Sequence, residues 1–412
     1  MNESNANGRT VSLSPFPRSK QVGGNALSTQ QSNRALLLRL IKDHRIISRV
    51  ELARLTGLKK ATITININEF LNVGLVCNAG HIESDSGRKV RGICIAPNNF
   101  YVISVRLSTS FFSLALHDIN SDCIIVRRFE FDSTLTLRAV FGLMRAEIQK
   151  FISLVSSAKV IAIGVGYDGV ITLSDWPVHS DEEFDLEAAL TAAFDIPVMI
   201  NSSLYFSTYQ WRHLSEYNMS LHTFMLVNVG PVVSSFLQAS PETLLTGSQG
   251  YAGSIGRIGV GFDANGNVLT LDDVLTADAI IKTVRQMMPD YPDSILNRYP
   301  RLTIQRVIDA YEMGDSLARD VYERAFRTLG RLFSELINFS NPDCIVLNGD
   351  IPYSEDVLRL LKEESSKNIH PNAKVDIIFD SSATSSAEQN DPILSGISLF
   401  LTNRSFKSIV IT

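Results

Sequence analysis

Residues 47–76 read ISRVELARLTGLKKATITININEFLNVGLV, a pattern that predicts two short helices joined by a tight turn. Ser48 is followed three residues later by Glu51, the spacing at which two side chains each accept a backbone N–H at the start of a helix. Gly57 then permits a turn of the backbone that a Cβ atom would obstruct. Many proteins read DNA with such a helix pair, although the same pattern also occurs as an ordinary hairpin of a protein core.

The second helix of this pair has two different faces. Apolar residues recur along one face and are expected to pack on the first helix: Ile63, Ile67, Phe70 and Leu71. The first helix is expected to turn Leu52 and Leu55 inward to meet them. The opposite face presents Ala61, Thr64, Ile65 and Asn68, with Lys59, Lys60 and Thr62 around its N-terminal end. Such an end fits the major groove of DNA, where Asn68 is expected to bridge an adenine edge and Ile65 to meet a thymine methyl group.

The sequence on either side of the helix pair favours DNA binding over a core hairpin. Upstream, NRALLLRLIK (residues 33–42) predicts a third helix that closes a small three-helix core. Downstream, Gly74 ends the second helix, and the polar stretch HIESDSGRKVR (residues 81–91) interrupts an extended run, which predicts a two-stranded wing. Three basic residues lie near the tip of this wing: Arg88, Lys89 and Arg91. They either form a solvated charged loop or contact DNA phosphates or the minor groove.

Length and charge divide the chain into two unequal parts. At 412 residues it is long enough for two or three domains, so a large second part must follow the helix pair. Residues 1–95 carry 14 basic and 6 acidic residues, a net charge of +8, whereas the remainder carries 24 and 37, a net charge of −13. This distribution is expected when only the N-terminal region touches the DNA polyanion.

Composition also predicts the compartment. No apolar run approaches the ~18 residues of a membrane span. Residues 1–30 lack the apolar centre of a signal peptide and are expected to form a flexible polar tail. The four cysteines stand singly, without a disulfide framework or a paired metal-binding spacing: Cys77, Cys94, Cys123 and Cys344. These features predict a soluble protein of the reducing cytoplasm.

From Asn99 onward, strands and helices alternate. Three β-rich runs at residues 100–108, 110–119 and 123–131 predict an antiparallel meander. Further elements are expected as a helix over 135–155, strands over 160–170, 196–203, 222–230 and 343–350, and helices over 320–337 and 353–369. A set of strands followed by alternating β and α elements occurs twice in this order, which predicts a two-lobed α/β body with a cleft.

From about residue 33 the chain resembles the ROK family, the repressors and sugar kinases of the actin-like ATPase superfamily, and in particular its repressor branch. The resemblance is carried by residues 33–76, by SGRKVRGICIAPNNFYVISV, and by IGVGYDGV, PVMINSSLYFSTYQW, LLTGSQGYAGSIGRIGV and NPDCIVLNGDI in the family's order. It implies an α/β fold with an N-terminal winged helix-turn-helix domain over 31–96 and a two-lobed actin-like, ribonuclease H-like body over 97–412. The lobes are expected over about 97–200 and 201–412, with the C-terminal segment packing back.

The resemblance also locates the motifs of the family kinases, and these are eroded here. Arg106 stands where a kinase has the Asp close to the ATP phosphates, and no glycine follows it in the turn. The second phosphate loop keeps only Gly230, and Pro231 removes a backbone donor. Ser202 replaces the catalytic Asp base and is most simply a polar turn residue after a strand. We therefore expect no ATP cofactor and no enzymatic activity.

The family's metal and sugar positions have changed as well. Many members hold Zn²⁺ with a His and a cysteine loop, but Arg257 and the thiol-free stretch 262–267 stand here, so a hairpin without metal is expected. The positions that match the family's sugar contacts are Asn201, Ser202, Ser254, Arg257 and Asp272. Arg257 suits an anionic effector such as a phosphosugar. Alternatively, Arg257 pairs with a carboxylate such as Asp263, or the effector is not a sugar.

These residues and the resemblance predict a DNA-binding transcriptional repressor of carbohydrate-related genes with a catalytically inactive, kinase-like domain for an effector or for dimerisation. The expected partners are double-stranded DNA, a sugar or phosphosugar effector and further copies of the chain in a homodimer or homotetramer, with no membrane. Two alternatives stay open. One is a regulator controlled by a protein partner, and the other is an active sugar kinase with an accessory DNA-binding head.

Overall fold

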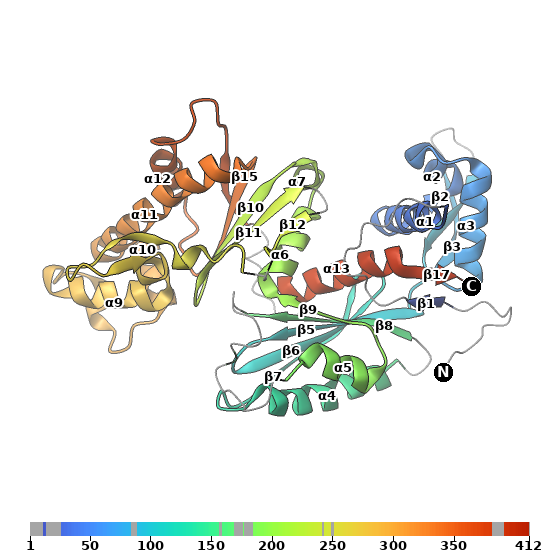
Figure 1. Ribbon diagram of the computed structural model, residues 1–412, viewed down its shortest axis with the longest axis horizontal. Helices are drawn as coiled ribbons and strands as arrows, with labels where there is room; N and C mark the ends of the chain where they lie inside the picture. The colour runs from blue at the N-terminus through green and yellow to red at the C-terminus, as the bar shows by residue number, and fades with distance from the viewer. Residues whose placement is uncertain are drawn as a thin grey trace. The chain divides into compact units, whose positions relative to one another are not determined.

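The computed structural model describes residues 11–13, 26–83, 89–155, 159–168, 176, 184–240, 243–248, 251–380 and 391–411. The chain forms two compact units (Figure 1). The first unit contains Met1–Tyr167, Ser174–Asn201 and Ala387–Thr412, and the second contains Asp168–Leu173 and Ser202–Ser386. The first unit therefore holds both ends of the chain, and one long insertion forms most of the second.

The N-terminal part of the first unit, residues 26–95, is called the head. Its described residues form the helices α1 (Ala26–Asp43), α2 (Arg49–Thr56) and α3 (Lys60–Asn72). They also form a sheet with the order β2 (Ile47–Ser48), β4 (Lys89–Ile95) and β3 (Val76–Glu83), in which β3 and β4 make an antiparallel hairpin. Fully buried residues from all three helices make the core of the head: Leu37, Leu38, Ile41, Leu52, Ile63, Ile67 and Phe70. The helix expected over 33–42 is present and begins earlier, at Ala26.

The local signals of the helix pair are confirmed. The backbone N–H of Glu51 donates to Ser48 Oγ at 3.1 Å, which caps the start of α2. Gly57 ends α2 in the left-handed region with a φ of 68°. The apolar stripe of α3 is buried as expected, except that Leu71 is only partly buried.

The inward orientation expected for Leu55 is wrong, because this side chain is 41% exposed. Helix α2 has only 8 residues, and its buried side is centred on Leu52 and continues one turn further to the partly buried Thr56. Leu55 therefore lies beyond the edge of the contact between α2 and α3.

The rest of the first unit is built around a five-stranded sheet in the order β7-β6-β5-β8-β9. The strands are β5 (Phe100–Leu107), β6 (Phe111–Asp118), β7 (Cys123–Glu130), β8 (Lys159–Tyr167) and β9 (Val198–Ser202). The expected antiparallel meander of β5, β6 and β7 is confirmed, and β8 runs parallel to β5. Helices α4 (Leu137–Ser153) and α5 (Leu186–Phe194) cover one face, and α13 (Pro392–Ser408) covers the other (Figure 1).

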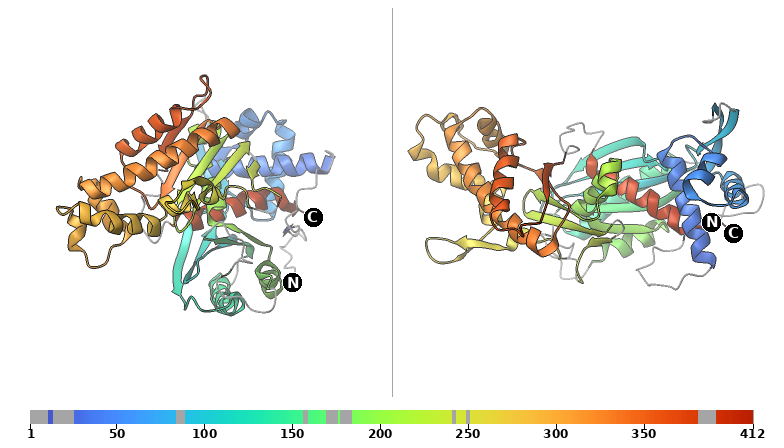
Figure 2. Two further views of the ribbon diagram at one scale, coloured as in Figure 1. Left: turned by 60° about the vertical axis from the view of Figure 1, so that its left-hand side comes forward. Right: turned by 90° about the horizontal axis from the view of Figure 1, so that it is seen from above.

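Helix α13 packs closely on this sheet and also on the head. A Cβ atom on Gly164 of β8 would lie 2.4 Å from a methyl carbon of Ile397, so only glycine allows this approach. On its other side α13 lies alongside α1 (Figure 2). The helix near the end of the chain therefore connects the sheet of the first unit to the head.

The second unit repeats the strand order of the first. Its main sheet has the order β12-β11-β10-β15-β16, with antiparallel pairing from β12 to β10 and parallel pairing from β10 to β16. The strands are β10 (Phe224–Val229), β11 (Val233–Ser240), β12 (Thr243–Leu245), β15 (Cys344–Gly349) and β16 (Asp376–Phe379). The expected α/β body is confirmed, with one five-stranded mixed sheet in each unit.

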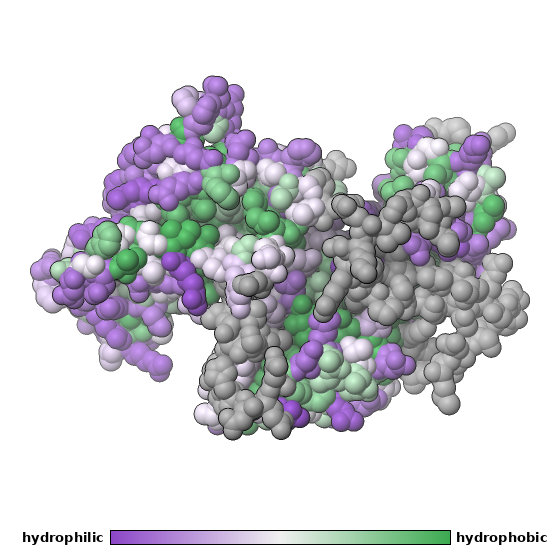
Figure 3. All heavy atoms as spheres, in the orientation of Figure 1, coloured by the Kyte–Doolittle hydropathy of each residue, from purple (hydrophilic) through white to green (hydrophobic). Residues whose placement is uncertain are grey.

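Helices and a small hairpin complete the second unit. The helices are α6 (Ser203–Arg212), α7 (Glu216–Ser220), α8 (Asp272–Leu275), α9 (Ala277–Met287), α10 (Ile304–Glu312), α11 (Ser316–Ser340) and α12 (Glu355–Ser366). The hairpin joins β13 (Gly259–Phe262) to β14 (Val268–Thr270). The exposed face of α12 carries Glu355, Asp356, Arg359, Lys362 and Glu363, and hydrophilic side chains predominate around this helix on the face drawn in Figure 3.

The flexible polar tail expected over residues 1–30 is wrong at residues 11–13 and 26–30, and the rest of this range lies outside the described residues. Strand β1 (Val11–Leu13) pairs antiparallel with β17 (Ile409–Ile411), and α1 already begins at Ala26. The local pattern could not predict this strand, because it has three residues and its partner lies at the opposite end of the chain. No helix among the described residues is long and apolar enough to cross a membrane.

Candidate functional site

The exposed side of α3 carries the residues expected to contact DNA. Lys59 is the N-cap residue of the helix and makes no side-chain capping hydrogen bond. Of the residues predicted on this helix, Thr62 is partly buried. The other five are exposed: Lys59, Lys60, Thr64, Ile65 and Asn68. Ile65 is 58% exposed, so its side chain is accessible to a binding partner. The Thr64 hydroxyl donates to Lys60 O at 2.9 Å, so its oxygen can still accept a hydrogen bond.

Helix α3 is fixed against α1 by an ion pair. Arg34 Nη2 lies 2.5 Å from Glu69 Oε2, and both side chains are largely buried. The carboxylate of Glu69 is therefore drawn toward α1 and away from the exposed side of α3. Residues 59–68 of the candidate interface themselves include no acidic residue.

Asn68 is held by a residue that the sequence reasoning missed. Arg49, the first residue of α2, donates from Nη2 to Asn68 Oδ1 at 2.9 Å. The one available signal was its position, because the helix dipole disfavours a cation in the first turn of a helix. A pairing across 19 positions could not be predicted from periodicity alone.

The hairpin expected to act as a wing consists of β3 and β4. Lys89 and Arg91 are exposed on β4, opposite Glu83 and His81 of β3. Arg88, the third basic residue expected at the tip, lies outside the described residues. The register of β3 shifts between Asn78 and His81, where Gly80 adopts a φ of 85°. The two described basic side chains are thus on a hairpin that follows α3 directly in the chain.

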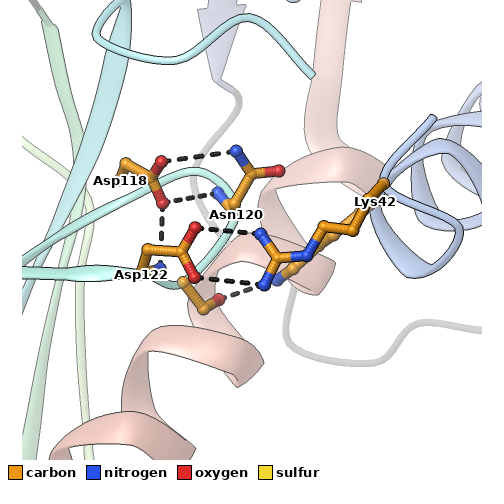
Figure 4. Close-up of polar contacts among 6 residues, drawn as sticks. Lys42, Asp118, Asn120 and Asp122 are labelled. Atoms are coloured by element: carbon orange, nitrogen blue, oxygen red, sulfur yellow. Dashed lines mark hydrogen bonds and ion pairs between the residues drawn. The ribbon is translucent and has the colours of Figure 1, made fainter. Parts of the chain in front are cut away.

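A polar contact joins the end of α1 to the turn between β6 and β7 (Figure 4). Lys42 Nζ donates to Ser121 Oγ at 2.7 Å. Arg45 donates to both carboxylate oxygens of Asp122, at 2.9 and 3.1 Å. Arg45 and Ser121 both have left-handed backbones, with φ values of 59° and 68°, which few side chains adopt without a specific contact. We call these four residues the head–sheet contact.

Asp118 stabilises the turn between β6 and β7 that contacts the end of α1. Its Oδ1 accepts the backbone N–H groups of Asn120 and Asp122, both at 2.9 Å (Figure 4). Burial lowers the pKa of Lys42 to about 7, against the opposing attraction of Asp43, Asp118 and Asp122. Burial, and to a lesser extent Lys42, also lowers the pKa of His117 to about 4. Lys42 of this contact and the buried His117 of β6 are therefore both held where their charged forms are disfavoured.

Three of the predicted effector residues lie together in the second unit. Arg257 ends the short 3-10 helix η2 (Ile255–Arg257), and Ser254 precedes this helix and donates to Tyr251 O at 2.8 Å. Asp272 lies against the same helix, because a Cβ on Gly256 would fall 2.1 Å from its Oδ1. That oxygen accepts the backbone N–H of Val233 at 2.7 Å. Asp272 therefore anchors β11 with one oxygen, which leaves the other for a further hydrogen bond.

The alternative that Arg257 pairs with Asp263 is wrong. The carboxylate of Asp263 instead closes the turn between β13 and β14, where it accepts hydrogen bonds from Asn265 N, Asn267 N and Asn267 Nδ2. These bonds lower the pKa of Asp263, chiefly those from Asn267. The guanidinium of Arg257 is exposed and has no ion-pair partner within the part of the chain that the structure describes.

The other two predicted effector residues end β9. Ser202 caps α6, since its Oγ accepts the backbone N–H of Tyr205 at 3.2 Å, and it is buried. This is the structural turn role that the sequence favoured for Ser202. Asn201 is the residue before it, and the boundary between the two units falls between them. Asp168, which the sequence reasoning missed, accepts a hydrogen bond from the neighbouring Ser203 hydroxyl at 2.7 Å.

The family model described as "ROK family" matches residues 102–402, which is most of the chain. The chain belongs to the ROK family. A xylose repressor of Caldicellulosiruptor bescii is 22% identical over 361 residues, which cover 82% of this chain and 88% of the relative. The DNA-binding transcriptional dual regulator NagC of Escherichia coli K12 is 26% identical over 348 residues, which cover 81% of this chain and 84% of NagC.

A solved structure extends the likeness to the region before residue 102. The crystal structure of a ROK family transcriptional regulator, a homologue of the E. coli MLC protein, superposes with a TM-score of 0.73 at 20% identity. The match covers 91% of this chain and 99% of that one. The fold of nearly the whole chain is therefore one that a ROK regulator also has.

The position of the kinase aspartate in this ROK chain holds an ion pair. Arg106 Nη1 lies 3.2 Å from Asp391 Oδ2, and Asp391 also accepts the backbone N–H of Ile393 at the start of α13. In the turn after β5 the N–H of Ser108 is already taken by Phe111 O at 2.8 Å. The Ser108 N–H is thus occupied, and the Arg106 side chain forms an ion pair within the fold.

The ROK zinc positions hold the hairpin that the sequence predicted. Strands β13 and β14 are joined by the Asp263 turn, with Gly266 at a φ of 82°. Among the described residues no three His, Cys, Asp or Glu side chains cluster as metal ligands. The polar side chains of this turn hydrogen-bond to one another within the turn. Arg257 has no acceptor atom, so it is chemically unsuited to bind a cation.

Proposed function

We propose that this ROK protein is a DNA-binding transcriptional repressor of carbohydrate-related genes and that residues 31–96 form a winged helix-turn-helix domain. The observation that carries the proposal is the exposed side of α3, where two lysines at the helix start precede Thr64, Ile65 and Asn68 and no acidic residue occurs among positions 59–68. The net charge of +8 on residues 1–95 supports it. The printed names of the xylose repressor and of NagC point in the same direction.

Selecting bound fragments from fragmented genomic DNA tests this proposal and yields the operator. Asn68→Ala should cost roughly 1–3 kcal/mol on that operator and leave non-specific binding nearly unchanged. Replacing Lys89 and Arg91 together with alanine should weaken binding to all DNA and reduce the slope of log K against log salt by about one to two. Lys362→Ala, an exposed lysine of the second unit, is the matched control. Binding no fragment more tightly than mixed-sequence DNA would contradict the proposal.

We infer that residues 97–412 are a catalytically inactive, sugar-kinase-like body that binds a sugar or phosphosugar effector. The exposed guanidinium of Arg257 supports an anionic ligand, and Asp272, which lies against Gly256 of the same short helix, has a second oxygen that can accept a hydroxyl. Thermal shift with hexoses and hexose phosphates tests this inference. A phosphate-specific shift should be lost in Arg257→Met and kept in Arg298→Met, an exposed arginine elsewhere in the same unit. Equal shifts in both variants would remove Arg257 from the site.

We further propose that the protein acts in the cytoplasm as a homodimer or homotetramer. A repressor with one head per chain gains specificity by placing two heads on two half-sites of a palindromic operator. Analytical ultracentrifugation with and without operator DNA measures the state directly. A monomer that binds a single half-site at full affinity would exclude this arrangement.

A further inference from the structure

The hydrogen bond between Arg49 and Asn68 has a consequence for base recognition. A carboxamide has one acceptor end and one donor end, and in principle either can face outward. An arginine side chain can only donate, so the atom that meets Arg49 Nη2 at 2.9 Å must be the Asn68 oxygen. The Asn68 nitrogen, with its two N–H donors, is therefore the end that remains for DNA.

The surroundings of Arg49 keep this bond in place. The two neighbouring carboxylates are taken by other arginines, because Glu69 pairs with Arg34 and Glu51 pairs with Arg54. Within the described residues Arg49 has no carboxylate at ion-pair distance. The oxygen of Asn68 is thus the side-chain acceptor on which Arg49 is held, and no competing anion draws it away.

The edges of the bases differ in what they require from such a pair. Adenine presents an acceptor and a donor in the major groove, so a carboxamide that bridges it must use both its nitrogen and its oxygen. Guanine presents two acceptors, N7 and O6, which N–H donors alone can satisfy. Both Asn68 Nδ2 and the free N–H groups of Arg49 are donors.

We propose that Arg49 sets the base preference of Asn68 by occupying its oxygen, so that the pair recognises guanine where a free asparagine would recognise adenine. This inference rests on the proposed DNA-binding function. It replaces the expectation from sequence that Asn68 bridges an adenine edge. Arg49 belongs to the first helix of the pair, so one base preference is determined by both helices together.

The test is selection of binding sites from a randomised DNA library by the full-length protein and three variants. The parent protein should prefer guanine at the base pair where Asn68→Ala loses its preference. Arg49→Met, which keeps most of the length but removes every donor, should shift that position toward adenine and change the guanine-to-adenine ratio by about tenfold. Arg54→Met, on the same helix and paired with Glu51, should leave the ratio unchanged.

Several outcomes would overturn the inference. One is a parent protein that prefers adenine at the Asn68 position, and another is an Arg49→Met variant that loses affinity evenly for all sites without a change of base. If the parent selects no sequence at all, the proposed function fails and not only the role of Arg49. Circular dichroism and the melting temperature of each variant distinguish a changed preference from a head that has unfolded.

Discussion

The buried ammonium of Lys42 predicts a specific pH dependence of the head–sheet contact. The side chain is 6% exposed, and its pKa in the folded protein is about 7, whereas the ordinary value is 10.5. At pH values between 7 and 10.5, Lys42 is protonated in the unfolded chain and largely deprotonated in the folded chain, so the unfolded chain binds one more proton at this site. Stability therefore rises as the pH rises above 7, and the cost of burying the charge is fully present below pH 7.

The magnitude follows from the two pKa values. The full difference corresponds to roughly 4–5 kcal/mol, and the part gained between pH 7.0 and 8.5 is roughly 1–2 kcal/mol. Above pH 8.5 other groups lower the stability as the pH rises, because burial raises the pKa of Cys94 to about 11 and that of Cys344 to about 12. The comparison is therefore confined to pH 7.0–8.5, where His117, with its pKa of about 4, stays neutral.

Replacing Lys42 with methionine keeps a long side chain but removes the charge. Hydrogen exchange of peptides from α1, corrected for intrinsic rates, reports the free energy of opening this contact. The opening free energy of the parent protein should rise by roughly 1–2 kcal/mol from pH 7.0 to 8.5, and that of Lys42→Met should show no comparable rise. Lys60→Met, at an exposed position of α3, serves as control and should behave as the parent. The same gain in parent and Lys42→Met would refute the reasoning.

Three further predictions concern the body. Purified protein should not phosphorylate glucose, mannose, N-acetylglucosamine or N-acetylmannosamine with ATP, and turnover above background that a variant of Arg106 abolishes would contradict this. Elemental analysis should find no stoichiometric zinc, so about one Zn²⁺ per chain would reveal a ligand set outside the positions considered. Gly256→Ala should destabilise the second unit by about 1–3 kcal/mol in urea unfolding, because the added Cβ displaces Asp272 from the backbone N–H of Val233. An unchanged unfolding midpoint would show that Asp272 can move aside without loss of stability.

Local patterns predicted the secondary structure of this chain well. The cap at Ser48, the turn at Gly57 and the meander of β5 to β7 each depend on a few neighbouring residues, so the sequence contains the whole signal. The orientation of Leu55 could not be predicted in this way. Helical spacing alone places it inward, but the two-turn α2 offers a contact only around Leu52.

The contacts that give the candidate sites their chemistry connect distant residues. Lys42 and Ser121 are 79 positions apart, and Arg106 and Asp391 are 285 apart. No periodicity links such pairs, and the side chains involved look like ordinary surface charges in the sequence. Asn68 illustrates the same limit, because its position on α3 was predictable but the atom that it presents depends on Arg49 from another helix.

The ion pair between Arg106 and Asp391 gives a physical reason for the loss of the kinase motif. Asp391 starts the helix that packs both on β5 and β8 and on α1 of the head. An aspartate at position 106 is too short to reach Asp391 and carries no positive charge, so it would leave the largely buried Asp391 carboxylate without its ion-pair partner. A chain that anchors α13 through Asp391 therefore needs a cation, and not an aspartate, at the end of β5. The residue that a phosphate-binding site requires and the residue that holds α13 in place are mutually exclusive at position 106.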